Sequence, residues 1–177
     1  MRQPILDVNN IKEIMKHRKP GETLDLTSER PVYSGSFKPG NGWQRISFNK
    51  SYSCRYFALE ALNSHKNDDF ASIAELEILN EDGKPISRQT WSILYADSEE
   101  TVAANNTALN VFDLQESTIW HTAYSEIKDK FPHSIVIDLG KEQRITGFEY
   151  LPRMEENYPG MIKDFNIYLQ TKPFVVK

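Results

Sequence analysis

From about residue 22 onward, the sequence repeats one pattern, in which a short apolar or alternating segment is followed by a polar turn. Alternation of apolar and polar residues over a few positions is typical of strands with one buried face. The predicted strands are 23–26, 44–48, 55–62, 73–79, 91–95, 134–139, 145–151 and 165–169. Helices do not alternate with these strands, as they would in a parallel α/β sheet. We therefore predict an all-β fold, an antiparallel β-sandwich or barrel.

Residues 9–19 are the exception, because they have the pattern of a short helix. Asn10 stands at a capping position, Glu13 follows three residues later, and Pro20-Gly21 ends the segment. We assign residues 1–28 to this helix and a lead-in segment.

The bulk properties exclude several classes of protein. A chain of 177 residues is long enough to bury a core without disulfides or metals. The net charge of −4 argues against nucleic-acid binding, and no apolar run is long enough for membrane insertion. Cys54 is the single cysteine, and we expect it to be a buried packing residue. The N-terminus has no apolar signal core, which fits either a cytoplasmic protein or a piece of a longer exported one.

Motifs of catalysis are missing from the sequence, and we expect a non-enzymatic domain. There is no HExxH, no CxxC and no glycine-rich phosphate loop. The four histidines lack zinc-ligand spacing. A glycosidase needs two carboxyl groups that face each other across a cleft. The adjacent pairs of this chain are expected to meet water instead: Asp68/Asp69, Glu99/Glu100 and Glu155/Glu156.

A set of segments in the second half is more specific. They are ALNVFD at 108–113, TIWHT at 118–122, PHSIVIDLG at 132–140, ITGFEYLPR at 145–153 and IKDF at 162–165. Together they resemble the first half of a coagulation factor 5/8 type C, or discoidin, domain. More narrowly, they are similar to the bacterial family-32 carbohydrate-binding modules of glycoside hydrolases. The resemblance implies a jelly-roll sandwich of the galactose-binding-like type.

The first half of the chain resembles the other end of the same family pattern. Residues 55–61 and 70–78 are similar to the last two strands of the family, yet here they come first. One explanation is a circularly permuted single sandwich over residues 29–177. The alternative is a tandem arrangement, with residues 29–90 ending one module and 91–177 starting another. We favour permutation because each half alone would leave sheet edges unpaired. Contact between Glu75 and the Asp113 loop distinguishes the two.

The resemblance also implies a sugar site on the loops. Aromatic rings stack on the C–H face of a pyranose, and polar groups hydrogen-bond its hydroxyls. The positions that match such a site are His121, Tyr124, Arg153, Phe70, Asn157 and Tyr158. The family often has an acidic residue near position 104, where this chain has Ala104. A hydroxyl acceptor is therefore missing from the pattern.

A structural calcium ion is the further implication of the resemblance. Asp113 and Thr118 match ligand positions, and Glu75 matches the acidic residue of the last strand. Calcium binds six to eight oxygens. The usual Asp-Gly-Asp pattern is replaced here by Asp113-Leu114-Gln115, which lowers the charge of the loop, although Glu116 is a substitute ligand.

These features predict a non-catalytic carbohydrate-binding module that is attached to, or cut from, a larger glycoside-active protein. The expected partner is a glycan that ends in a galactose-type or N-acetylhexosamine sugar. By resemblance, the setting is secreted, periplasmic or at the cell surface. The alternative is a protein-interaction or spacer module that kept the sandwich without the sugar site.

Overall fold

The structure, a computed structural model, describes residues 23–26 and 29–176, and nearly all of its regular structure is strand. The elements are β1 (Tyr33–Ser36), β2 (Gln44–Ala61), β3 (Ser72–Ile73), β4 (Glu75–Leu79), β5 (Ser92–Ala96), the 3-10 turn η1 (Ala108–Phe112), β6 (Trp120–His121), β7 (His133–Leu151) and β8 (Asp164–Gln170). The helix predicted at 9–19 lies outside the described residues. Within the described part of the chain, no helix has the length and apolarity needed to cross a bilayer.

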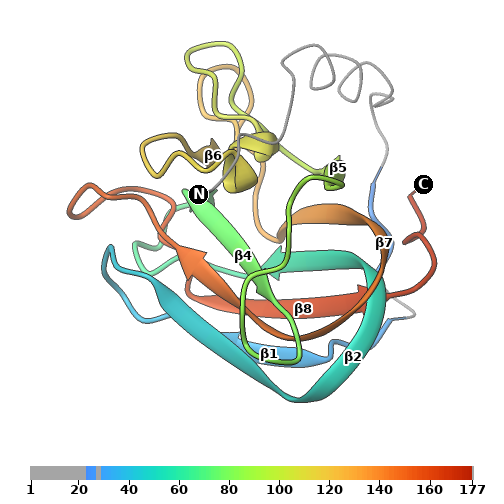
Figure 1. Cartoon of the computed structure of the whole chain (residues 1–177). Coiled ribbons are helices and arrows are strands. Elements are labelled where there is room, and N and C mark those ends of the chain that lie inside the picture. Colours follow the sequence, from blue (N-terminus) through green and yellow to red (C-terminus); the bar gives the residue numbers. More distant parts are fainter. Residues whose placement is uncertain (1–22, 27–28, 177) are drawn as a thin grey trace.

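Six of the described strands form one antiparallel sheet that folds over on itself, and β3 and β6 form a separate two-stranded sheet. The order of the large sheet is β1-β8-β2-β7-β4, and β5 pairs with β7 as well. The first part of β2 pairs with the second part of β7 from Gln44↔Tyr150 onward, and its last part pairs with the start of β7 up to Ala61↔His133. Both strands bend between these two regions (Figure 1). One bent ladder therefore supplies strands to both layers, which confirms an antiparallel β-sandwich.

The bend in β7 merges two predicted strands into one. The segments 134–139 and 145–151 belong to the single strand β7, and 44–48 and 55–61 belong to the single strand β2, although the pairing between the two strands is interrupted at the bends. Gly140 has a φ of +81°, and a Cβ there would lie 2.5 Å from the Thr90 carbonyl oxygen. Register shifts interrupt the β2–β7 pairing near the bend of β2. Bulges and glycine turn a strand without ending it, so a break in alternation did not mark a strand end here.

Aromatic side chains fill the space between the layers. The Phe37 ring stacks between Tyr150 and Phe165, with centroid distances of 3.9 and 4.0 Å. Trp120 is fully buried, as predicted for a core residue. Cys54 is also buried, and burial together with the nearby Glu142 raises the pKa of its thiol to about 12. The thiol is therefore protonated and acts as a packing group, as expected.

Strands from both halves of the chain share this sheet. β2 lies between β7 and β8, and β4 pairs with the last part of β7. The Glu75 carboxyl group interacts with Asp113, which is the contact that a single sandwich requires. The domain boundary between residues 28 and 29 stays a prediction. Leu24, on the N-terminal side of this boundary, pairs with Val176 near the other end of the chain.

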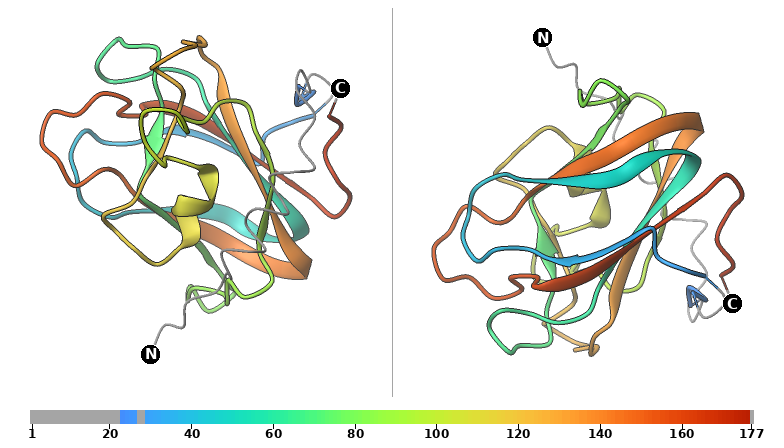
Figure 2. Two further views of the ribbon diagram at one scale, coloured as in Figure 1. Left: turned by 90° about the horizontal axis from the view of Figure 1, so that it is seen from above. Right: turned by 90° about the horizontal axis from the view of Figure 1, so that it is seen from below.

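The loops that join these strands gather at one end of the sandwich. η1, β6 and the long connections around them lie above β7 and β4 in Figure 1, and Figure 2 shows the molecule from above and from below this layer. The short β3 and β6 pair with each other through Ile73 and Trp120 and connect this loop layer to the core. This end of the molecule holds most of the predicted site residues.

His133 ties two of these loops to the start of β7. Its ring is fully buried, with Nδ1 2.8 Å from Asp97 Oδ2 and Nε2 2.7 Å from the Asp69 carbonyl oxygen. Both partners are acceptors, so both ring nitrogens donate and the ring carries a positive charge. Burial lowers the pKa of His133, but the Asp97 carboxylate and the Asp69 carbonyl outweigh it, and the net shift is upward.

This link predicts a loss of stability at alkaline pH. Because the folded-state pKa of His133 is raised, its contribution is fully present below the unfolded value near 6.5 and is lost as pH rises through the folded value. We expect the Tm to fall by roughly 2–4 °C from this group, about 1 kcal/mol in a domain of this size. Calorimetry from pH 6 to pH 9 on the protein and on His133→Gln measures it. The same pH slope in both proteins contradicts the assignment.

Candidate functional site

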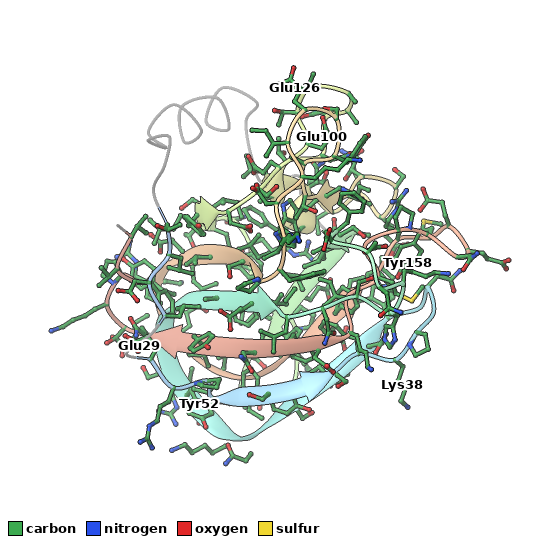
Figure 3. The ribbon with its side chains drawn as sticks, turned by 180° about the vertical axis from the view of Figure 1, so that it is seen from behind. Glu29, Lys38, Tyr52, Glu100, Glu126 and Tyr158 are labelled. Carbon is green, nitrogen blue, oxygen red and sulfur yellow. The ribbon has the colours of Figure 1, made fainter. Side chains whose placement is uncertain are left out.

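A pocket of about 450 Å³ opens among the loops at the end of the sandwich. Its lining residues come from both halves of the chain and are Phe70, Asn106, Ile119, His121, Tyr124, Lys128, Arg153 and Pro159. Four of the six predicted sugar-site residues are therefore brought together, although they lie on three separate segments of the sequence. Figure 3 shows the same loop region from behind, with Glu100 and Glu126 labelled in it.

His121 is placed by the short strand β6. Trp120 anchors this strand, because its indole is fully buried and Nε1 donates to the Ser98 carbonyl oxygen at 2.9 Å. His121 Nδ1 lies 2.6 Å from the Thr122 carbonyl oxygen, so Nδ1 carries the hydrogen. Burial is the main cause that lowers the pKa of His121, so the ring is neutral at pH 7. Nε2 is then an acceptor for a ligand.

Three rings form one wall of the pocket. The His121 ring lies between Phe70 and Tyr124, with centroid distances of 5.4 and 5.1 Å. The Tyr124 ring meets His121 edge to face at 85°, which is a favourable geometry for aromatic pairs. The wall is thus apolar on its faces and carries one histidine acceptor.

A buried carboxylate holds the loop that carries Tyr124. Glu100 is 1% exposed, and its side chain accepts five hydrogen bonds from the two neighbouring loops. Oε2 accepts from the Tyr124 and Ser125 amides at 2.8 and 2.9 Å. Oε1 accepts from the Ser125 hydroxyl at 2.6 Å and from the amides of Val102 and Ala103. These bonds lower the pKa of Glu100, so the group stays charged.

Asp68 fixes the Phe70 loop in a similar way. Its Oδ1 accepts from the Phe70 amide and its Oδ2 from the Gly160 amide, each at 3.1 Å. Ala71, which follows Phe70, donates a hydrogen bond to the Thr122 hydroxyl and accepts one from the Thr122 amide. Thr122 in turn directly follows His121. The loops that carry Phe70, His121 and the Gly160 turn are therefore joined to one another behind the pocket.

Arg153 lies across the pocket at the end of β7. Its guanidinium stacks over the Tyr158 ring at 5.6 Å and contacts Glu155 at 3.2 and 3.3 Å. The Glu155 side chain is 61% exposed, so this pair is weak and screened by water. Arg153 itself is mostly buried, which holds its charge near the pocket.

Asn157 and Tyr158 lie away from this pocket. Both line a second hollow of about 260 Å³, together with Gly40, Asn41 and Glu155. Tyr158 is buried and donates its hydroxyl hydrogen to the Gly40 carbonyl oxygen at 3.1 Å. Burial raises the pKa of this hydroxyl to about 12. The Tyr158 ring packs against the Arg153 guanidinium and is not among the residues that line the first pocket.

Sequence reasoning missed Asn106, Lys128 and Glu100. Asn106 accepts from the His121 amide through its backbone oxygen and donates to Glu100, a pairing that no motif encodes. Glu100 was expected to meet water, and this was wrong because loop amides surround it. The run Thr101 to Asn106 directly after the Glu99/Glu100 pair was the signal available, since short loops present several unpaired amides.

The three predicted calcium ligands also lie together. Thr118 Oγ1 donates to Asp113 Oδ2 at 2.5 Å, and the Asp113 carboxylate interacts with Glu75. Glu75 Oε1 is buried without a hydrogen-bond partner among the described residues. Burial, and then Asp113, raise the pKa of Glu75 to about 9, against the opposing effect of Arg88. A proton or a cation between the two carboxylates relieves their repulsion.

Arg88 already neutralises part of this cluster. Its guanidinium is buried and bridges Glu75 and Glu77 at 2.5 and 2.8 Å. Because the raised pKa keeps Glu75 protonated at neutral pH, Glu77 and Asp113 against one guanidinium leave one negative charge, and a divalent ion would have to displace the Glu75 proton. No group of three or more histidine, cysteine or acidic side chains in the described ranges has an arrangement that could hold a metal ion by itself. A calcium ion would therefore depend on backbone oxygens and Thr118 as well as on Asp113 and Glu75.

Comparisons with known proteins agree with the predicted resemblance. A family model described as F5/8 type C domain matches residues 95–173. The sialidase of Micromonospora viridifaciens is 38% identical over 84 residues, which is 47% of this chain and 13% of that protein. A galactose oxidase of Gibberella zeae is 34% identical over 90 residues, again 13% of its length. The resemblance to the F5/8 type C domain is confirmed, and the chain matches a small part of each enzyme.

The Glu100 contacts predict local loosening when the carboxylate is replaced. In Glu100→Gln, the side-chain NH2 faces backbone donors, so the amides of Ala103 and Tyr124 lose a charged acceptor. We expect hydrogen–deuterium exchange in 101–104 and 123–126 to accelerate by roughly tenfold or more. The matched control is Glu126→Gln on the same loop, which is exposed. Unchanged exchange, or acceleration throughout β7 as well, contradicts the local role of Glu100.

Proposed function

We propose that this chain is a non-catalytic carbohydrate-binding domain that takes a terminal galactose-type or N-acetylhexosamine sugar into the loop pocket. The observation that carries the proposal is the wall of Phe70, His121 and Tyr124 with Arg153 across from it. An apolar wall combined with a few converging polar groups is the usual composition of a sugar or small-ligand site.

Each group has a role that follows from its chemistry. The faces of Phe70 and Tyr124 pack on the C–H face of a pyranose. His121 Nε2 accepts a hydrogen bond from a hydroxyl, because Nδ1 is already committed to Thr122. Arg153 donates to hydroxyl or ring oxygens. The pocket is small and open, so little ligand surface is buried, and we expect weak affinity for a single sugar.

The carboxylates near the pocket support a binding role rather than hydrolysis. Glycoside hydrolysis uses one carboxyl as acid and another as base or nucleophile. None of the eight lining residues is acidic, and the nearby Asp68 and Glu100 are held by backbone amides.

The context of the domain forms part of the proposal. The relatives named above are a sialidase and a galactose oxidase, and the matched stretch is a small fraction of each. We infer that this domain attaches a larger glycoside-active protein to its glycan in a secreted, periplasmic or cell-surface setting. The net charge of −4 speaks against nucleic acid as a partner.

A second candidate is a protein-interaction or spacer module without a sugar ligand. Ala104 favours it, because this position lies on the loop between Glu100 and Asn106 and offers no acceptor for a sugar hydroxyl. The convergence of Phe70, His121, Tyr124 and Arg153 favours the sugar instead.

A glycan array followed by calorimetry tests the sugar site. We expect binding to glycans that end in galactose-type or N-acetylhexosamine residues. His121→Ala and Arg153→Ala should weaken binding about tenfold or more, as the loss of a hydrogen bond near a charged or buried group does. Asn157→Ala is the matched control, because Asn157 faces the other hollow and should retain binding. Lack of binding to every glycan supports the spacer.

Calcium is proposed as a structural ion at Asp113, Thr118 and Glu75. We expect calcium at about a hundred times its Kd to add about 2.7 kcal/mol of stability. This raises the Tm by roughly 5–10 °C in a domain of this size. Asp113→Asn should abolish the shift, whereas the exposed Glu156→Gln should keep it. An unchanged Tm of the parent protein on calcium addition rejects the ion.

A further inference from the structure

The charges that line the loop pocket are all of one sign. Of its eight lining residues, Arg153 and Lys128 carry permanent charges, and both are positive. The chain as a whole has a net charge of −4, so the positive charge of the pocket lining is opposite in sign to the net charge of the protein. After burial, the Arg153 charge also lowers the pKa of His121, while Asp68 and Glu100 act in the opposite direction, so Arg153 lies within reach of the aromatic wall although it is not the only charge there.

Asp68 and Glu100, the carboxylates behind the pocket, pair with backbone amides rather than with these cations. Their oxygens point at backbone amides of the surrounding loops, at distances of 2.8 to 3.1 Å. Glu155 contacts Arg153, but from an exposed position where the attraction is screened. Lys128 is exposed and makes no ion pair within the described part of the chain, although Glu126 and Asp129 are close in sequence.

The side chains that line the pocket also offer more hydrogen-bond donors than acceptors. Arg153 and Lys128 offer hydrogen-bond donors alone, and the side-chain acceptors of the lining are His121 Nε2, the Tyr124 hydroxyl and the Asn106 amide oxygen. A neutral hexose has a hydroxyl hydrogen to place for every hydroxyl oxygen. A carboxylate or a sulfate presents oxygens without hydrogens and is matched by the guanidinium fork.

We propose that the pocket prefers a galactose-type sugar that bears an acidic group, a carboxylate or a sulfate ester, over the neutral sugar. The acidic group contacts Arg153 and Lys128 while the ring packs on the aromatic wall. This inference rests on the proposed function, because it names the ligand class of the same pocket. Position 104 then needs no acid: a carboxylate on that loop would repel such a ligand.

Calorimetric titration of the full chain with galactose, galacturonic acid and galactose 6-sulfate tests the preference. We expect at least one acidic sugar to bind about fivefold or more tightly than galactose at low salt, which two screened ion pairs provide. The advantage should shrink at about 0.5 M salt, where the Debye length falls to a few ångströms. The sugar with the greater advantage identifies the acidic group as carboxylate or sulfate.

Variants separate this inference from the sugar site itself. Lys128→Gln should lower the ratio of acidic to neutral affinity by about two- to fivefold. Lys141→Gln, an exposed lysine at the bend of β7, is the matched control and should leave the ratio unchanged. Equal affinity for galactose and both acidic sugars, or a ratio that Lys128→Gln does not alter, overturns the preference while the sugar site stands. Failure of all three sugars to bind overturns the preference, and the proposed function is overturned with it where N-acetylgalactosamine and N-acetylglucosamine also fail to bind.

Discussion

The long antiparallel ladder between β2 and β7 is the constraint on which the rest of the molecule depends. These strands pair on both sides of their bends, so a single ribbon forms the centre of one layer and most of the other. The bends require particular backbones. A Cβ on Gly147 would lie 2.2 Å from the Ile46 carbonyl oxygen, inside the neighbouring strand. The positions of β4, β5 and β8 follow, because each pairs with β2 or β7, and β1 is added at the edge through its pairing with β8.

The loop end of the sandwich is organised by a different kind of interaction. Loops leave backbone amides without ladder partners, and buried carboxylates take up these donors here. Glu100 and Asp68 each join segments that are far apart in the sequence, and His133 joins two more. The pocket walls are therefore held by charged hydrogen bonds rather than by regular structure. Because these acidic side chains hydrogen-bond to loop amides behind the pocket, the charged residues of the pocket lining are Arg153 and Lys128.

Much of this architecture could be predicted from the sequence. Alternation identified most strands, and the apolar context identified Trp120 and Cys54 as buried. The prediction of separate strands failed at the bends, because Gly140 and the bulges change direction without ending the ladder. For the site, the family pattern predicted that Phe70, His121, Tyr124 and Arg153 lie close together. The structure places all four around one pocket. The family pattern did not show that Tyr158 lies outside this pocket. The Tyr158 side chain is buried next to Arg153 and contacts the distant Gly40, which no local motif indicates. Glu100 was missed because three of its five hydrogen bonds come from Tyr124 and Ser125, on a loop that only the complete fold brings next to it.

The central ribbon also has a consequence for how the chain folds. Partners such as Arg45 and Glu149 lie 104 residues apart, so the first stable pairings must close very long loops. Chains dominated by such distant pairings fold slowly, in milliseconds to seconds. The complete pocket depends on these pairings, because Arg153 follows the end of β7 and Phe70 lies on the loop that leaves β2. Until these pairings have formed, the apolar strands and their open edges are exposed, and the nascent chain is at its most prone to aggregation.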